Sequence, residues 1–175
     1  MKLYHGSPQN LYILKPQKAK RTKNPIWIHI EHKDVRKVRE GLTLVPNAVN
    51  TLSKLKKMGL KMVVLSVSPL PPRKAKERLA GNLEHFGILK YFDQVYATKK
   101  YPESKGEHML KVIKGYGFKK SEALMVGDIY LWDFSSAKKV GIKAILFEHN
   151  YDPKIHHYRK VKAKIKDFKE VLKYV

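Results

Sequence analysis

The chain has 175 residues; 37 are lysine or arginine and 15 are aspartate or glutamate, which gives a formal net charge of +22. This length suits about one domain, and a hydrophobic content of 43% is too high for a disordered basic tail. Cysteine is absent, which excludes a disulfide scaffold, a thiolate nucleophile and a cysteine zinc site. Neither a run of ~18 apolar residues nor a signal peptide is visible, so we expect a cytoplasmic protein without membrane contact.

The positive charge comes mostly from lysine, with 31 Lys against 6 Arg. Strongly basic proteins commonly bind polyanions such as RNA. A thermophilic surface would enrich lysine and glutamate together, but only 9 Glu are present. Lysine is a compact point charge, whereas arginine is the better reader of base edges, so this bias favours contacts with phosphates.

The chain divides by composition into a basic N-terminal arm at residues 1–24 and one domain at residues 25–175. Residues 1–25 contain six Lys or Arg and no acid. After the arm, strand and helix patterns alternate at short intervals. We expect strands at 25–30, 61–66, 94–97, 123–126 and 142–147, and helices at 47–58, 73–85, 105–114, 132–140 and 167–174. Alternating charge at 154–169 predicts a further edge strand.

This alternation predicts an α/β fold in which helices cover both faces of a mostly parallel sheet. In open sheets of this kind, ligands bind beyond the carboxyl ends of the strands. Ser66 and Asp128 stand at such ends, as do His29 and Glu31 in the predicted first strand. The sequence therefore predicts a polar site at this edge.

Three segments resemble motifs of the haloacid-dehalogenase-like superfamily. Gly127, Asp128, Asp133, Ala137 and Gly141 are similar to its fourth motif in a strand–helix context. The segment LKKMGLKMVVLSVSP resembles the second motif, with Ser66 at the hydroxyl position, and KKYPESKGEHMLKVIKGYGF resembles the third, with Lys105 at the lysine position. The run YPESKGEHM is especially similar to the compact magnesium-dependent phosphatase branch. The resemblance implies a three-layer Rossmannoid fold with little or no cap domain.

In active members of this superfamily, an aspartate at the end of the first strand attacks a phosphoryl group, and a second aspartate acts as acid and base. The resemblance implies that the hydroxyl and the lysine hold phosphoryl oxygens. The fourth-motif aspartate, here Asp128, helps to bind Mg²⁺. A carboxylate nucleophile divides phosphoryl transfer into two steps, and cations neutralise the charge of the transition state.

The first motif departs from the family pattern because the predicted strand reads IWIHIEHKD. Here His29 takes the nucleophile position, Glu31 takes the acid position, and no Asp-x-Asp pair occurs in the chain. His29 could be a phosphorylated nucleophile, part of a transition-metal site with Asp128 and Glu31, or a pocket residue left after catalytic decay. Asp34 is an alternative nucleophile.

The retained positions have structural interpretations as well. Asp128 could cap the helix that follows it, Lys105 could form an ion pair with Asp128, and Asp133 is expected to be structural. The catalytic set His29, Glu31, Ser66, Lys105, Asp128 and Asp133 is then vestigial, and Asp128 alone is a weak metal ligand.

We therefore expect a non-catalytic, basic protein that binds RNA, as a ribosomal or ribosome-associated protein beside other ribosomal proteins, with no cofactor. The predicted nucleic-acid contacts are Lys15, Lys18, Lys20, Arg21, Lys23, Arg36, Lys37, Arg39, Arg73, Lys74, Arg159, Lys160, Lys162 and Lys164. The alternative is a magnesium-dependent phosphatase of the same superfamily that acts on a phosphomonoester.

Overall fold

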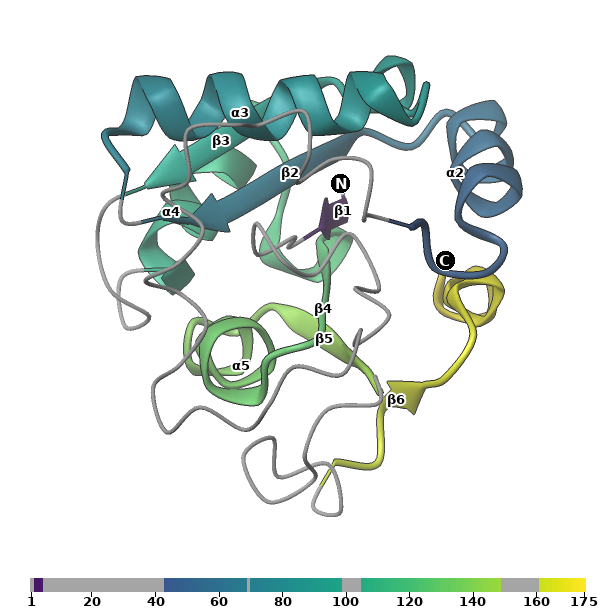
Figure 1. The fold of residues 1–175 in the computed structure, drawn as a ribbon. Helices are drawn as coiled ribbons and strands as arrows, with labels where there is room; N and C mark the ends of the chain where they lie inside the picture. The colour runs from purple at the N-terminus through teal and green to yellow at the C-terminus, as the bar shows by residue number, and fades with distance from the viewer. Residues whose placement is uncertain (1, 5–42, 69, 99–104, 149–160) are drawn as a thin grey trace, which may run out of the picture.

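The fold is a six-stranded sheet with helices on both faces (Figure 1). The computed structural model describes residues 2–4, 43–68, 70–98, 105–148 and 161–175. The strand order is β3-β2-β1-β4-β5-β6, and every neighbouring pair is parallel. The strands are β1 (Lys2–Tyr4), β2 (Met62–Val67), β3 (Gln94–Thr98), β4 (Leu124–Gly127), β5 (Lys143–Phe147) and β6 (Lys164–Ile165). The α/β class predicted from the sequence is confirmed.

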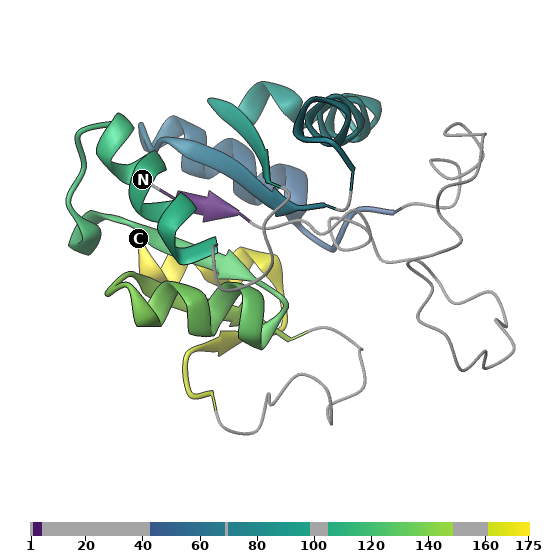
Figure 2. The same cartoon turned by 90° about the vertical axis from the view of Figure 1, so that its left-hand side faces the viewer.

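The first strand of the sheet is not where the sequence patterns placed it. β1 lies in the middle of the sheet between β2 and β4, which Figure 2 shows as a purple arrow. Lys2–Tyr4 therefore belong to the sheet and not to a basic arm, because their backbone pairs on both sides. The rest of the predicted arm, residues 5–24, and the predicted strand at 25–30 lie outside the described residues.

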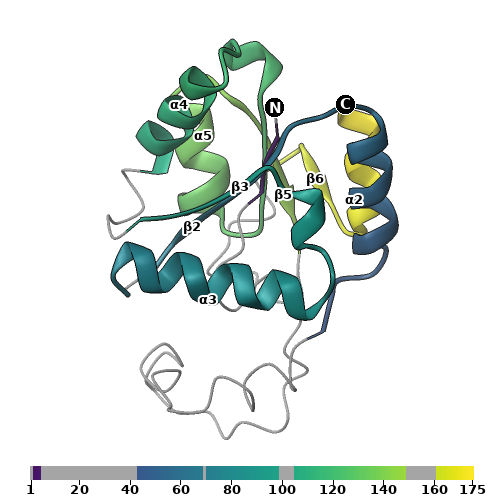
Figure 3. The same cartoon turned by 90° about the horizontal axis from the view of Figure 1, so that it is seen from above.

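Two layers of helices bury two separate cores. The helices are α2 (Ala48–Lys57), α3 (Pro72–His85), α4 (Lys105–Gly115) and α5 (Ser136–Lys139), with 3₁₀ turns at Leu89–Tyr91 and Lys120–Glu122. In Figure 3, α4 and α5 lie on one side of the sheet, and α2 and α3 lie on the other. Successive residues of β2 pack alternately into the two cores. Met62 and Val64 pack with α2 and α3, whereas Val63 and Leu65 pack with α4 and α5.

Most predicted elements are present within a few residues, but three differ in kind. The helix expected at 132–140 begins as a π-helix, η5 (Tyr130–Ser135), and continues as α5. The last helix is the 3₁₀ helix η7 (Phe168–Tyr174). The alternating segment at 154–169 yields only the short β6 among its described residues. No helix in the described ranges is both long and apolar enough to span a bilayer.

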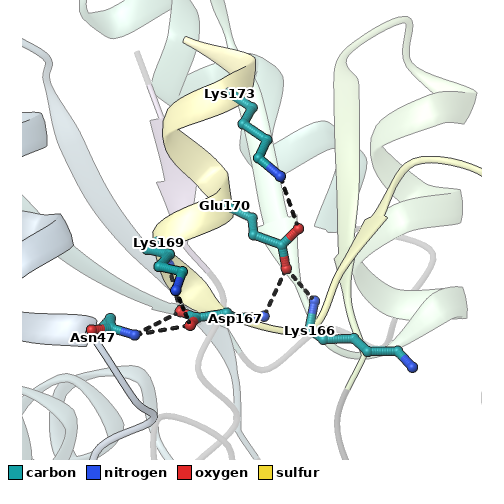
Figure 4. Close-up of polar contacts among 6 residues, drawn as sticks. All are labelled: Asn47, Lys166, Asp167, Lys169, Glu170 and Lys173. Atoms are coloured by element: carbon teal, nitrogen blue, oxygen red, sulfur yellow. Dashed lines mark hydrogen bonds and ion pairs between the residues drawn. The ribbon is translucent and has the colours of Figure 1, made fainter.

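A polar cluster fixes η7 against α2 (Figure 4). Asn47, at the start of α2, donates from its amide nitrogen to both carboxylate oxygens of Asp167, at 3.0 and 2.9 Å. Asp167 also accepts from the backbone N–H of Lys169 at 2.9 Å, and Glu170 accepts from the backbone N–H of Asp167 at 3.0 Å. These bonds form a capping box at the start of η7. The cluster therefore anchors the C-terminal segment.

Asp93 links the start of β2 to the start of β3. These amino-terminal ends of the strands lie at the opposite end of the sheet from the predicted site. The Asp93 carboxylate accepts from the backbone N–H of Met62 at 2.9 Å and pairs with Lys56 and Lys61 at 3.1 and 3.2 Å. Burial alone would raise the pKa of Asp93, but the Met62 bond and the two lysines outweigh it and lower the pKa below 3.8. A carboxylate with a lowered pKa stabilises the fold above its unfolded value and loses this effect as the pH falls.

The first prediction is that Asp93→Asn destabilises the protein at neutral pH by about 1 kcal/mol, because two partly exposed ion pairs are lost. The difference from wild type should shrink as the pH falls below 3.8, where the wild-type carboxylate also becomes neutral. Urea unfolding at a series of pH values measures this, with Glu84→Gln as an exposed control on α3. A difference that stays constant down to pH values well below 3.8 would show that the charge of Asp93 is not its stabilising feature.

Candidate active site

The site lies where β2 and β4 end on either side of β1. Tyr4, the last residue of β1, is level with Val64 in β2 and Val126 in β4. Ser66 and Asp128 each lie two residues further along, so they stand at the same height, two residues beyond the level of Tyr4. Strands in a sheet are spaced about 4.8 Å apart, which puts the backbones of Ser66 and Asp128 roughly 10 Å apart.

A buried ion pair lies beneath this edge. Lys105 is the first residue of α4, and its Nζ donates to Oδ1 of Asp133, which belongs to η5. Both side chains have 0% exposure. Burial lowers the pKa of Lys105 from 10.5 to about 8, and the charges of Asp133 and Asp128 oppose that shift. Lys105 is therefore mainly an ammonium ion at neutral pH and lies within electrostatic reach of Asp128.

Asp133 also shapes the turn that carries Asp128. Its second carboxylate oxygen accepts from the backbone N–H of Ile129 at 3.0 Å. A Cβ atom on Gly127 would collide with the Asp133 side chain, so only glycine fits there. The π-helix η5 begins directly after this turn, and such helices are frequent at functional sites. Asp133 thus holds the loop in which Asp128 stands. The N-cap residue of η5 is Ile129, and this end of the helix has no side-chain cap, so the expected capping role of Asp128 is not found.

Ser66 and Asp128 contribute a hydroxyl and a carboxylate at the carboxyl ends of β2 and β4. Both are buried, with exposures of 2% and 3%. The Ser66 hydroxyl donates to the carbonyl oxygen of Val67 at 3.5 Å, a long and weak bond that a ligand could replace. Asp128 carries its carboxylate directly after β4, two residues beyond the level of Tyr4.

Asp128 is the described residue best placed to hold a Mg²⁺ ion. Magnesium is often bound by one or two protein carboxylates together with water and substrate phosphate oxygens. Asp128 supplies one such carboxylate, whereas the oxygens of Asp133 are engaged by Lys105 and Ile129. No group of three or more His, Asp or Glu side chains suited to a metal occurs among the residues the structure describes. The donor set thus fits an ion shared with a phosphorylated ligand.

Four of the six predicted catalytic positions lie among the described residues, and all four are buried: Ser66, Lys105, Asp128 and Asp133. The pairing within the set differs from one expectation, because Lys105 bonds to Asp133 while Asp128 acts on it through its charge. His29, Glu31 and Asp34 lie outside the described residues. In the sequence, β1 is followed by His5, and the first acid of the chain is Glu31.

The predicted basic contacts do not form one surface among the described residues. Arg73 and Lys74 lie on α3, which packs beside β3, whereas Lys162 and Lys164 lie at β6 on the other margin of the sheet. Lys164 forms an ion pair with Glu148 at 3.3 Å. The remaining predicted contacts lie outside the described ranges: Lys15, Lys18, Lys20, Arg21, Lys23, Arg36, Lys37, Arg39, Arg159 and Lys160.

Sequence reasoning missed a group of polar residues beside Ser66. Ser68, Arg78 and Asn82 line a small cavity with it between β2 and α3. Arg78 and Asn82 are four residues apart on α3 and therefore share one face of the helix. That spacing, read together with Ser66 near the end of β2 and Ser68 directly after it, is the signal that could have identified the group.

The second prediction concerns the buried pair. Lys105→Met or Asp133→Asn should each cost about 3–5 kcal/mol in unfolding free energy, because each leaves a buried charge without its partner. The double variant should lose less than the sum of the two. Urea unfolding of wild type, the two single variants and the double variant gives a double-mutant cycle. Arg73→Met is a control at an exposed ion pair on α3. Strictly additive losses would mean that the two charges do not stabilise each other.

Comparisons with curated proteins find two named phosphatases that are similar to this chain. Over 111 residues the chain is 28% identical to ribulose-1,5-bisphosphate 5-phosphatase from Halopiger xanaduensis, which covers 62% of this chain and 44% of the relative. Over 112 residues it is 25% identical to phosphoglycolate phosphatase from Rhodobacter capsulatus, covering 64% of this chain and 48% of the relative. The chain thus spans about half the length of these curated relatives.

Solved structures share the fold. A protein from Listeria monocytogenes serotype 4b superposes with a TM-score of 0.68 at 21% identity, covering 99% of this chain and 94% of that one. A HAD phosphatase from Thermococcus onnurineus gives a TM-score of 0.64 at 24% identity, covering 87% of this chain and 65% of that one. At these identities the likeness shows the fold alone.

These comparisons overturn part of the expectation from sequence. The prediction of an RNA-binding or ribosomal protein, with RNA and ribosomal proteins as partners, is wrong, because the family model describes a hydrolase and both curated relatives are named as phosphatases. The prediction of RNA binding rested on the net charge, which describes the whole surface and does not identify a binding site. The expectation of no cofactor is wrong for the same reason, since phosphatases of this kind typically depend on Mg²⁺.

The family itself is settled by a match that spans most of the chain. The model of haloacid dehalogenase-like hydrolases matches residues 4–147, from the last residue of β1 to the end of β5. The matched range contains all four residues that converge at the sheet edge. This chain belongs to the haloacid dehalogenase-like hydrolase family.

Proposed function

We propose that this protein is a magnesium-dependent phosphatase that hydrolyses a small phosphomonoester. The observation that carries the proposal is the convergence of Ser66, Asp128 and the buried Lys105–Asp133 pair at the carboxyl edge of the sheet. A hydroxyl donor, a carboxylate and a lysine from three separate segments lie at this end of the sheet. A structural role alone does not require all three groups there.

Each of these groups has a role in binding a phosphoryl group. The Ser66 hydroxyl can donate to one phosphoryl oxygen once it leaves its weak bond to Val67. The Lys105 ammonium supplies positive charge in a buried setting, where electrostatic interactions are stronger than in water. Asp128 would hold the Mg²⁺, which when bound offsets the negative charge of the phosphoryl oxygens. Asp133 is a positioning residue because it fixes Lys105 and the Asp128 turn.

Small anionic substrates suit both the relatives and the charge of this chain. Ribulose-1,5-bisphosphate and phosphoglycolate, which the relatives are named for, are phosphomonoesters that carry a second anionic group. A net charge of +22 raises the local concentration of such anions. We therefore assign a phosphorylated small molecule with more than one negative group as the substrate class.

The third prediction tests the metal and its ligand. Wild-type protein should hydrolyse p-nitrophenyl phosphate in the presence of Mg²⁺, and chelation should abolish the reaction. Asp128→Asn keeps the side-chain shape but removes the charge, and it should lower kcat by about 100-fold or more. Asp93→Asn is the matched control, since Asp93 lies at the opposite edge of the sheet, and it should retain wild-type turnover at 25 °C. Equal turnover by wild type and Asp128→Asn would refute the proposed function.

The attacking group remains a prediction from sequence, with Asp34 as the candidate carboxylate and His29 as the alternative. We expect the carboxylate, because phosphate transfer to an aspartate gives the two-step reaction of the family. The fourth prediction is that labelled substrate, quenched in acid, leaves a protein-bound phosphate that hydroxylamine releases, as an acyl phosphate does. Asp34→Asn should abolish both label and turnover, whereas His29→Gln should not. A label that acid itself destroys would instead identify a phosphohistidine.

A further inference from the structure

The cavity between β2 and α3 lies directly beside the phosphoryl-binding hydroxyl. Ser66, Ser68, Ala75, Arg78, Leu79 and Asn82 line it. Ser66, Ser68 and Asn82 have exposures of 2%, 3% and 5%, so three buried polar side chains contribute to the lining of the cavity. It has room for about one water molecule. A space of this size accepts a single oxygen atom and excludes a whole phosphate group.

The donors of this cavity favour an anionic oxygen. The Ser68 oxygen already accepts from the backbone N–H of Leu70 at 3.2 Å, so its own hydroxyl hydrogen can be donated to a ligand. Asn82 carries two N–H donors and Arg78 carries five, together with a permanent positive charge. Within the described lining there is no carboxylate to repel an anion.

Arg78 is directed toward the site by the course of α3. The helix begins at Pro72, shortly after β2 ends at Val67, so its first turns lie near the carboxyl edge of the sheet. Helical side chains tilt toward the N-terminus of their helix, which directs Arg78 toward that edge. Its guanidinium suits paired hydrogen bonds to a planar carboxylate.

Arg78 and Lys105 come from helices on opposite faces of the sheet. Lys105 comes from α4, in the layer that packs with Val63 and Leu65, whereas Arg78 comes from α3, in the layer that packs with Val64. Ser66 lies between them at the end of β2. A ligand whose phosphoryl group is held by Ser66 and Lys105 would place a second group, a few bonds away, over Ser68 and Arg78.

We propose that Arg78, with Ser68 and Asn82, forms a subsite for a second anionic group of the substrate, and that this group is a carboxylate. The inference rests on the proposed phosphatase function and names the substrate class that the same site selects. One carboxylate oxygen enters the cavity in place of water, and the other faces the Arg78 guanidinium.

The fifth prediction tests this subsite by binding, independently of turnover. The probes are two phosphonates that cannot be hydrolysed, 3-phosphonopropionate and 3-hydroxypropylphosphonate, which differ only in the carboxylate. Isothermal titration in the presence of Mg²⁺ should show that wild type binds the carboxylate probe about 10-fold to 100-fold more tightly, as expected for a charged hydrogen-bonded pair. Arg78→Gln should remove this preference and leave the affinity for the hydroxyl probe unchanged.

Two further variants separate a built subsite from general attraction. Ser68→Ala should reduce the preference for the carboxylate in part. Arg73→Gln removes a positive charge from the exposed side of the same helix and should leave both affinities unchanged. Equal binding of the two probes by wild type, or equal losses in Arg78→Gln and Arg73→Gln, would overturn the subsite. The proposed phosphatase function fails separately, if wild type does not hydrolyse p-nitrophenyl phosphate.

Discussion

The buried ion pair between Lys105 and Asp133 is the interaction on which the site depends. Removing a lysine from water is costly, and that cost lowers the pKa of Lys105 to about 8. The fold tolerates the charge because Asp133 contacts it directly. The same carboxylate bonds to the Ile129 N–H and requires glycine at position 127. One side chain therefore fixes the start of α4, the end of β4 and the turn that carries Asp128. A buried pair of this kind adds little net stability over an apolar pair, so its value lies in the geometry that it imposes.

The two cores make the edge above this pair rigid. β2 sends alternate residues into different helix layers, so its end cannot shift without disturbing both cores. Ser66 is held in this way, whereas the described residues among the predicted basic contacts are divided between separate elements. Arg73 lies on α3 beside β3 and Lys164 lies on β6 at the far margin of the sheet. Dispersed lysines of this kind create a general positive field, which attracts small anions as readily as polymers. Charge alone could therefore not distinguish a phosphatase from an RNA-binding protein.

The sequence predicted those features that are carried by local patterns. Ser66, Lys105, Asp128 and Asp133 were found because the segments around them resemble family motifs in a strand and helix context. β1 was missed because Lys2–Tyr4 has only three residues, too few for any period to be visible. Its place in the sheet is set by pairing with β2 and β4, which are far away in sequence. The π-helix was missed because it differs from an α-helix by a single extra residue per turn. The partner of Lys105 was ambiguous because Asp128 and Asp133 lie in the same turn of chain.

The departure from the family pattern falls on one half of the site only. In the proposed function, the phosphoryl-binding half comes from β2, α4 and the end of β4, and the structure describes each of its residues. The family pattern would place the attacking half after the first strand, where the sequence continues with His5 and has no acid before Glu31. Binding and attack therefore depend on different segments of the chain and on different physical requirements. Binding needs fixed donors and positive charge, which the buried pair and the sheet edge provide without any nucleophile. Attack needs a group within bonding distance of phosphorus. The binding site does not depend on that group for its own structure. Under the proposed function, affinity for phosphorylated ligands and the rate of their hydrolysis would therefore be separable properties.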